Sequence, residues 1–204
     1  MCPATHDEIV TAQPADAWKL STVVAAAFHP LAVCRWLIPH AIQRRVALPA
    51  YFRILVEHAL TVGRIDTTPD RTAAALWLPV GADGPEPPEH YERRLKEAVG
   101  PHLERFEILD EQFEAHHPLG AEHQHLAILA VHPDHQRQGL GRALLEHRHR
   151  QLDQSGSPAY LEASDETNRA WYARYGYRDL GSPIRLPGGP EMFPMMRQPV
   201  ARNE

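Results

Sequence analysis

The sequence is short of cysteine, of lysine and of long apolar runs, and each shortage excludes a class of protein. Its two cysteines, Cys2 and Cys34, lie far apart and predict no disulfide framework, so a reducing cytoplasm is expected. No apolar run approaches the roughly 20 residues that a membrane span needs. The N-terminal segment has neither a basic start nor an apolar stretch, so we expect no signal peptide and no membrane partner.

Positive charge is also scarce. The 21 Lys and Arg residues against 26 Asp and Glu residues give a net charge of −5, and lysine occurs only at positions 19 and 96. Such a chain is a poor candidate for tracking a phosphate backbone, so no nucleic-acid partner is expected. An apolar share of 43% over 204 residues is typical of a globular protein and predicts a single domain, residues 1–204.

Hydrophobic periodicity divides the chain into helices and strands. Residues 126–131 are apolar on both faces, which is typical of a central strand covered on each side. A proline at position 49 is expected to kink or split the helix around it. The predicted helices span residues 18–28, 41–60, 89–99, 103–115, 141–154 and 168–175; the predicted strands span residues 9–11, 62–68, 73–78 and 159–163, with a closing hairpin from residues 177–186 and 192–197.

A loop with two glycines follows the strand at residues 126–131, and a helix is expected directly after it. The segment reads Val131-His132-Pro133-Asp134-His135-Gln136-Arg137-Gln138-Gly139-Leu140-Gly141-Arg142. Free backbone N–H groups and the helix dipole make such a helix start an anion site. Gly139 and Gly141 would let a phosphate approach without a Cβ in its path. The bare Gly-x-Gly also fits an ordinary turn.

The context of this loop favours the first interpretation. Gln136-x-x-Gly139-x-Gly141 after a strand resembles the acetyl-CoA pyrophosphate loop of the GCN5-related N-acetyltransferase (GNAT) superfamily. The strand at residues 160–164 and the segment Asn168-Arg169-Ala170-Trp171-Tyr172-Ala173-Arg174-Tyr175-Gly176-Tyr177 are similar to the family's next two elements. The resemblance covers about residues 124–180.

The resemblance implies an α+β fold, with a mixed, mostly antiparallel sheet of six to seven strands and helices on both faces. Residues 1–120 would form the acceptor side, and residues 121–204 would bind acetyl-CoA as co-substrate, with no metal. Arg137 and Arg142 could instead be merely solvated, and Asn168 could also cap its helix. The resemblance assigns acetyl-CoA to Leu129, Ala130, Val131, Gln136, Arg137, Gln138, Gly139, Leu140, Gly141, Arg142, Asn168 and Tyr175.

Within the family, the chain resembles the puromycin N-acetyltransferase-like branch. Ala25-Ala26-Ala27-Phe28, Val131-His132-Pro133-Asp134-His135-Gln136, Leu161-Glu162-Ala163-Ser164 and Met195-Met196-Arg197 support it. His29-Pro30 departs from the acidic residue that many members place before this proline. On the acceptor side the resemblance predicts Phe28, Trp36 and Trp77, although Trp77 also suits a plain core position.

Two side chains are candidates for the chemistry. Glu162 would act on the acceptor as a general base, directly or through water, or as an anchor; His125 and His29 are weaker alternatives for the base. Tyr172 matches the tyrosine that family members use to protonate the CoA sulfur, or else it only packs against the cofactor. The Val131 N–H is a candidate oxyanion donor.

The remaining patterns predict little chemistry. His123-x-His125 on a strand would share a face, but without a cysteine or carboxylate at ligand spacing a zinc site is not expected. We therefore expect direct acetyl transfer to the primary amine of a small molecule by a monomer or homodimer. A peptide or protein N-acetyltransferase and a non-catalytic acyl-CoA sensor are the alternatives. An acidic face would favour cationic amines if it borders the acceptor cleft; it comprises Glu104, Glu107, Asp110, Glu111 and Glu114.

Overall fold

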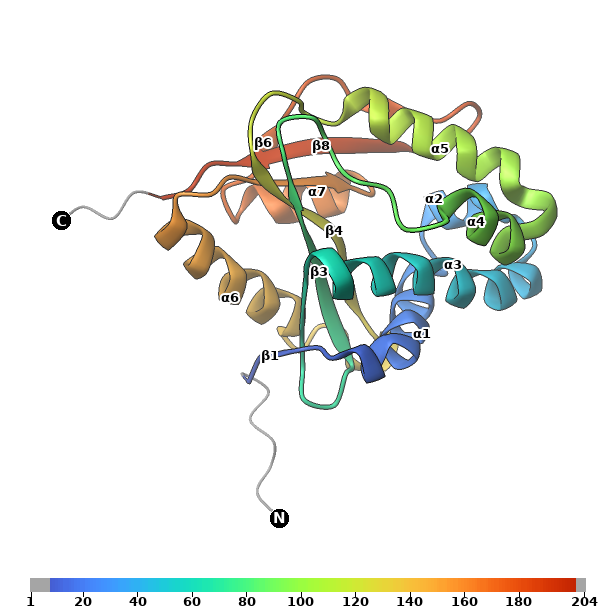
Figure 1. Ribbon diagram of the computed structural model, residues 1–204, viewed down its shortest axis with the longest axis horizontal. Helices are drawn as coiled ribbons and strands as arrows, with labels where there is room; N and C mark the ends of the chain where they lie inside the picture. Colours follow the sequence, from blue (N-terminus) through green and yellow to red (C-terminus); the bar gives the residue numbers. More distant parts are fainter. Residues whose placement is uncertain (1–7, 201–204) are drawn as a thin grey trace, which may run out of the picture.

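A computed structural model describes residues 8–200, which form one strongly twisted mixed sheet between two layers of helices (Figure 1). The strand order is β1-β2-β3-β4-β5-β8-β6, and β7 pairs with β8. Every pairing is antiparallel except that of β4 with β5. The strands are β1 (Val10–Thr11), β2 (Arg64–Thr67), β3 (Ala73–Val80), β4 (His123–Val131), β5 (Ala159–Ala163), β6 (Arg178–Asp179), β7 (Ile184–Arg185) and β8 (Glu191–Arg197).

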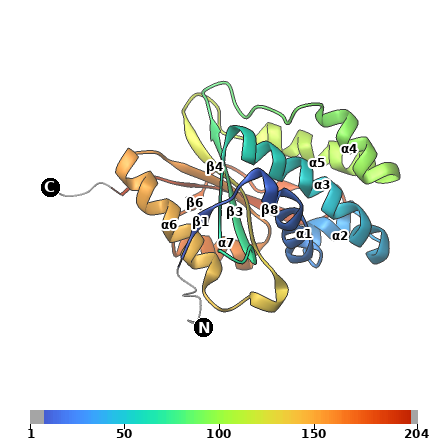
Figure 2. The same ribbon diagram turned by 60° about the horizontal axis from the view of Figure 1, so that its bottom comes forward.

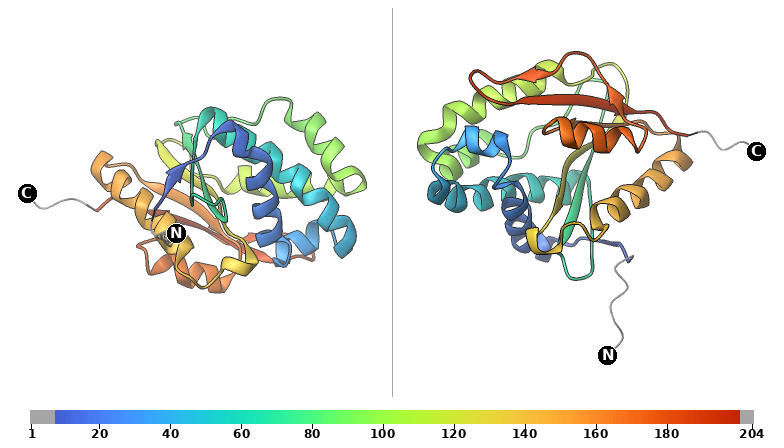
Figure 3. Two further views of the ribbon diagram at one scale, coloured as in Figure 1. Left: turned by 90° about the horizontal axis from the view of Figure 1, so that it is seen from below. Right: turned by 180° about the vertical axis from the view of Figure 1, so that it is seen from behind.

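Helices cover both faces of the sheet, and a separate hydrophobic core lies on each side. One core joins the helices of the first half to β2, β3 and β4, and the other joins α6 to β3, β4, β5 and β8. Seen from behind, α6 and α7 lie together on one face (Figure 3, right). The helices are α1 (Ala17–Phe28), α2 (Ala32–Leu37), α3 (Ala41–Val62), α4 (Tyr91–Val99), α5 (Leu103–His116), α6 (Leu140–Ser155) and α7 (Glu166–Ala173).

This architecture confirms the predicted fold class, a mixed, mostly antiparallel sheet with helices on both faces, although the sheet has eight strands where six to seven were expected. Several boundaries differ from the prediction. Pro49 lies inside α3, which runs unbroken through Val62. The strand predicted over residues 126–131 begins three residues earlier, at His123, because its polar first residues pair with β3. No helix within residues 8–200 is long and apolar enough to cross a membrane.

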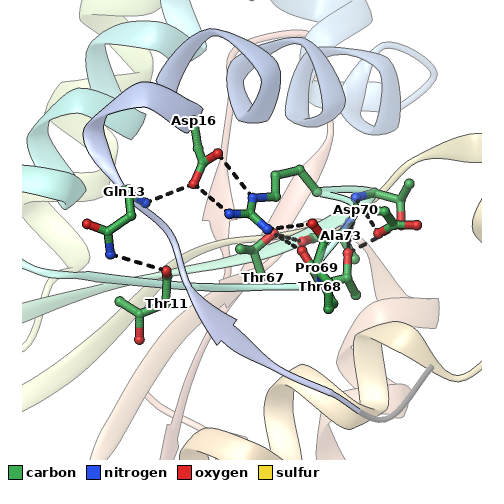
Figure 4. A network of polar contacts seen from close by, with 10 residues as sticks. Thr11, Gln13, Asp16, Thr67, Thr68, Pro69, Asp70 and Ala73 are labelled. Carbon is green, nitrogen blue, oxygen red and sulfur yellow. Dashed lines mark hydrogen bonds and ion pairs between the residues drawn. The ribbon is translucent and has the colours of Figure 1, made fainter. Parts of the chain in front are cut away.

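A polar network holds the turn between β2 and β3 against the start of α1 (Figure 4). Arg71 donates from Nε and Nη2 to the two carboxylate oxygens of Asp16, at 3.1 and 3.2 Å. The same carboxylate accepts from the backbone N–H of Gln13 at 2.9 Å. Directly after β4, His132 N donates to the carbonyl oxygen of Thr72 in this turn, at 2.8 Å. The network thereby fixes the point where β4 ends and the glycine loop begins.

An ion pair joins β8 to α6. Arg197 is 5% exposed, and its Nη2 donates to Asp153 Oδ2 at 2.8 Å while Nη1 lies 2.8 Å from Oδ1. The hydrogen bond from Arg197 is the main cause that lowers the pKa of Asp153. A lowered pKa means that this contribution is present above the unfolded pKa of about 3.9 and is lost as pH falls through the folded one.

We therefore expect Asp153→Asn to destabilise the fold by about 1–3 kcal/mol at pH 7, because it leaves the buried guanidinium of Arg197 without its counter-charge. Urea unfolding at pH 7 and pH 3 measures this. The difference between the two proteins should shrink at pH 3, where the parent's own carboxylate is becoming protonated. An equal difference at both pH values would contradict the assigned charge effect.

Candidate functional site

β4 and β5 lie side by side only near their first residues. The parallel ladder pairs Gln124 with Ala159 and His125 with Tyr160, whereas β4 continues to Val131 and β5 to Ala163. Past His125, no strand of the described chain pairs with β4 on this side. Backbone N–H and C=O groups along this edge therefore need partners from elsewhere, and an extended ligand that carries amides would supply them.

The glycine loop lies at the other end of β4, between that strand and α6 (gold, lower edge of Figure 2). Gly139 adopts a φ of 85° as the N-cap of α6, a conformation that an L residue adopts only with strain. A Cβ on Gly139 would meet no atom within 4 Å, and one on Gly141 would lie 3.7 Å from Val131 Cγ2. Both glycines thus leave open space at the N-terminus of a 16-residue helix, which fits an anionic ligand.

The polar side chains of the loop bond mainly to the protein itself. Gln136 Nε2 donates to the carbonyl oxygen of Val131 at 3.1 Å. Arg142 Nε donates to Glu146 Oε1 at 2.9 Å, although 65% of the Arg142 side chain is exposed. Arg137 has a φ of 62°, and Gln138 Nε2 lies 3.5 Å from the carbonyl oxygen of Asp134. The loop is therefore shaped by local bonds, and its backbone N–H groups remain its main means of holding an anion.

Two further residues that the sequence assigns to acetyl-CoA lie in or beside α7. Asn168 is not the N-cap of that helix, because Asp165 holds this position and accepts from the Asn168 N–H at 2.8 Å. Asn168 Nδ2 donates to Ser164 Oγ at 2.7 Å. Tyr175 is half-buried, and its ring centroid is 4.7 Å from that of Trp171.

Tyr172 lies on α7, on the same side of the sheet as α6. Its half-buried ring meets Trp171 and Tyr177 edge-on, with centroids 4.9 and 5.6 Å apart. The structure gives its hydroxyl no hydrogen-bond partner within residues 8–200, nor does it enclose that oxygen. Burial raises the pKa of Tyr172 above its ordinary range. The phenol is therefore protonated at neutral pH.

The carboxylate of Glu162 lies inside the protein, next to the point where β4 and β5 part. Its side chain is 8% exposed, and Oε2 accepts from His125 Nε2 at 2.9 Å. The other oxygen, Oε1, is buried without a hydrogen-bond partner in the described chain. Burial acts to raise the pKa of Glu162, but the adjacent His125 outweighs it and the pKa is lowered. Glu162 is therefore charged at neutral pH.

Aromatic rings surround this carboxylate. The His117 ring centroid lies 5.1 Å from that of His125 and 4.7 Å from that of Tyr160. His117 Nε2 lies 3.0 Å from His123 Nε2, which confirms that His123 and His125 share a face. Burial lowers the pKa of His117 to about 4 and lowers that of His123 as well. These two rings are neutral at pH 7, so of the three histidines only His125 bonds to the Glu162 carboxylate.

Besides Glu162, three residues were predicted for the acceptor side; Phe28 and Trp36 pack against one core, and Trp77 lies in the other. Phe28 is half-buried against Phe52, with centroids 5.1 Å apart. Trp36 donates from Nε1 to the carbonyl oxygen of Pro187 at 3.1 Å, between β7 and β8. Trp77 is 0% exposed and belongs to the core under α6, so its ring has no free face for an acceptor. Trp77 is therefore a core residue, which was the alternative that the sequence left open.

The other candidate groups lie outside the cluster around Glu162. His29 Nε2 lies 3.2 Å from the carbonyl oxygen of Ala41, in the first half. The acidic face is exposed along α5 except for Asp110, which accepts from Tyr91 Oη at 2.9 Å. Burial raises the pKa of Asp110 to about 6. Residues 8–200 contain no group of three or more His, Cys, Asp or Glu side chains arranged to hold a metal.

The glycine loop and the separated ends of β4 and β5 lie in a part of the chain that is similar to a known protein family. Residues 107–179, from α5 to β6, match the acetyltransferase (GNAT) domain family. Residues 107–179 thus carry a GNAT acetyltransferase domain. GNAT enzymes use acetyl-CoA as the acetyl donor, so the protein is an acetyl-CoA-dependent N-acetyltransferase. The open space at Gly139 and Gly141 and the unpaired backbone groups along β4 are compatible with the binding of acetyl-CoA.

Solved structures show the same fold over nearly the whole chain. A histone acetyltransferase HPA2-related acetyltransferase from Corynebacterium glutamicum is 24% identical, with a TM-score of 0.71 over 96% of this chain and 98% of that one. Arylalkylamine N-acetyltransferase 2 from Aedes aegypti is 14% identical, with a TM-score of 0.58 over 95% and 99%. The ribosomal-protein-S18-alanine N-acetyltransferase from Escherichia coli is 19% identical, with a TM-score of 0.54 over 97% and 96%.

The sequence did not reveal two members of the cluster in this GNAT domain. His117 follows α5 directly and Tyr160 lies on β5, 43 positions further along the chain. Only the sheet and the connection after α5 bring their rings together. The alternation of Tyr160 and Glu162 on one strand was the available signal, because residues i and i+2 share a face. The pattern of three histidines between positions 117 and 125 was the other.

Proposed function

We propose that this N-acetyltransferase acts on the primary amine of a small cationic molecule. The observation that carries the proposal is the charged Glu162 carboxylate, buried where β4 and β5 part. A buried carboxylate with one unpaired oxygen favours a positively charged partner, because an unmatched buried charge is costly. An ammonium group that approaches the adjacent His125 would be attracted by this charge.

Contacts between the two halves of the chain support a small acceptor. The Trp36 ring of α2 lies under Arg105 of α5, with the guanidinium carbon 5.5 Å from the ring centroid. The same ring bonds to Pro187 between β7 and β8. α2, α5 and the β7–β8 connection are thus tied to one another, which favours a walled acceptor side over an open groove for a peptide.

Each part of the site would have a separate role in the proposed reaction. The unpaired edge of β4 from Leu129 to Val131 would pair with the amides of the donor, and the loop at residues 136–142 would hold its pyrophosphate through backbone N–H groups. Tyr172 would give a proton to the departing thiolate. The Val131 N–H would stabilise the oxyanion that forms on the thioester carbon.

The structural neighbours show that the fold itself does not choose the acceptor. Their names include an arylalkylamine acetyltransferase and a ribosomal-protein-alanine acetyltransferase. We also propose membership of the puromycin N-acetyltransferase-like branch, which rests on the sequence similarity of residues 25–28, 161–164 and 195–197. The first of these segments lies at the end of α1, and the last ends β8.

Release of free CoA thiol from acetyl-CoA, measured with a panel of amines, tests the proposed function. We expect small primary amines that are cationic at pH 7 to give a kcat/KM at least about tenfold above that of peptides with a free N-terminus, a difference of about 1.4 kcal/mol. Peptides that are turned over faster would show a protein acceptor. Acetyl-CoA binding without thiol release for any amine would show a sensor.

A further inference from the structure

We propose that His125 takes the proton from the acceptor amine, and that Glu162 holds His125 in position for this step. This inference rests on the proposed function and assigns its general base. The sequence favoured Glu162 itself. Three features of the structure favour the histidine instead: its tautomer, its accessibility and its place in the sheet.

The hydrogen bond to Glu162 fixes the tautomer of His125. An ionised carboxylate can only accept, so His125 Nε2, 2.9 Å from Glu162 Oε2, must carry a proton. In the neutral ring, Nδ1 is then the atom with the free lone pair. A carboxylate that orients an imidazole in this way also stabilises the imidazolium that forms when Nδ1 accepts a proton.

Accessibility separates the two candidates. Glu162 Oε2 is engaged with His125, and Oε1 is fully buried. His125 Nδ1 makes no hydrogen bond within residues 8–200 and is not among the enclosed polar atoms. The side chain of His125 is 14% exposed, against 8% for Glu162. An incoming amine therefore meets the lone pair of Nδ1 before it meets a carboxylate oxygen.

The sheet puts His125 where the reaction must occur. The pair His125 and Tyr160 is the last one before β4 and β5 part. The register between β3 and β4 shifts immediately afterwards, between Leu76 and Trp77, and leaves one residue of β4 unpaired. The titratable groups packed against His125 are Glu162 and Tyr160 of β5 and His117 after α5. His123 of β4 packs against the same His117 and Tyr160.

Acetylation of an ammonium group requires a side chain that accepts a proton. An ammonium acceptor loses two protons when its nitrogen becomes an amide N–H. The first passes to His125 Nδ1 and frees the lone pair that forms the new C–N bond, and His125 later returns this proton to water. The second replaces the proton that Tyr172 gives to the thiolate as the C–S bond breaks. An imidazole nitrogen with a free lone pair can accept the first proton and later release it to water.

The test compares His125→Gln and Glu162→Gln, with His123→Gln as the matched control on the same strand and face. For alkylamines with a pKa near 10, we expect His125→Gln to lower kcat/KM by about 10²–10⁴-fold. The loss should shrink to less than about tenfold for amines with a pKa near 7, and it should ease as pH rises. Added imidazole should restore part of the activity of His125→Ala, and His123→Gln should remain near the parent.

Glu162→Gln should cost less than His125→Gln, because an amide oxygen can still accept the Nε2 proton. The double variant should be no worse than His125→Gln alone, since the two residues act as one unit. A larger loss in Glu162→Gln, with no rescue of His125→Ala by imidazole, would make Glu162 the base and overturn the proposal. An unchanged pH profile in His125→Gln would overturn it too. Failure of the proposed function is distinct: the parent enzyme would then release no thiol with any small amine.

Discussion

Replacing Tyr172 by phenylalanine is expected to lower kcat by about 10²–10⁴-fold while acetyl-CoA affinity stays within about twofold. The change removes one oxygen and leaves the edge-on contacts of the ring with Trp171 and Tyr177 intact. Because this hydroxyl has no hydrogen-bond partner in the described chain, its loss breaks no internal bond. Burial raises the pKa of Tyr172 above its ordinary range, so the parent enzyme always holds the proton that the thiolate needs.

The dependence on the leaving group separates a proton donor from a packing residue. With acyl donors whose thiol is more acidic, the thiolate leaves without a proton, and the defect of Tyr172→Phe should shrink. Tyr177→Phe is the matched control: it removes the hydroxyl that lies 3.1 Å from His149 Nε2, and it should lower stability while turnover holds. Single-turnover rates that match the parent in Tyr172→Phe would show that Tyr172 only packs.

Much of the fold follows from local patterns, because the apolar periodicities are strong. The helix that starts at Leu140 has Leu144 and Leu152 facing the core. It could be predicted from the 3.6-residue repeat of its apolar residues. The first three residues of β4 could not. His123, Gln124 and His125 are polar, and they form a strand because Val80, Pro79 and Leu78 of β3 pair with them. Tertiary pairing here overrides a weak local preference.

The position of Trp77 shows why the acceptor side was harder to predict. Leu76 lies in the core under the first-half helices and Trp77 in the core under α6, as regular alternation along β3 requires. The register shift interrupts the alternation on β4 instead, where Leu126 and Ile128, two positions apart, lie in different cores. The sequence alone does not show which face of the sheet borders the acceptor site and which face is covered by a helix.

The contact between His125 and Glu162 has the same origin. The two residues are 37 positions apart, and their hydrogen bond depends on the parallel register of β4 and β5. Glu162 could be chosen from the sequence because the resemblance puts a strand there. The sequence offers His125 only as a weaker alternative for the base, and its contact with Glu162 could not be predicted until the register of the two strands was known.

Introducing a carboxylate at Gly141 is expected to weaken acetyl-CoA binding at least about tenfold, or about 1.4 kcal/mol. Gly141 is the second residue of α6, where free N–H groups and the helix dipole favour an anion. A glutamate there would occupy that space and repel a pyrophosphate. Gly141 suits the test better than Gly139, because its new Cβ meets only Val131 Cγ2 at an ordinary 3.7 Å, whereas Gly139 has a φ of 85° and would be strained.

Two variants isolate the effect of the added charge. Gly141→Ala adds the Cβ alone and should bind acetyl-CoA within about threefold of the parent, a difference of less than about 1 kcal/mol. Gly81→Glu adds the same side chain at a glycine after β3 where a Cβ meets nothing within 4 Å, and it should leave binding unchanged. Isothermal titration with acetyl-CoA, at low salt and in 0.5 M salt, measures all three. The Gly141→Glu defect should be larger at low salt, because salt at about 0.5 M screens repulsion between charges near the surface. Parental affinity in Gly141→Glu would place the pyrophosphate away from this loop, and an equal loss in Gly141→Ala would show that the Cβ, rather than the charge, is what the site excludes.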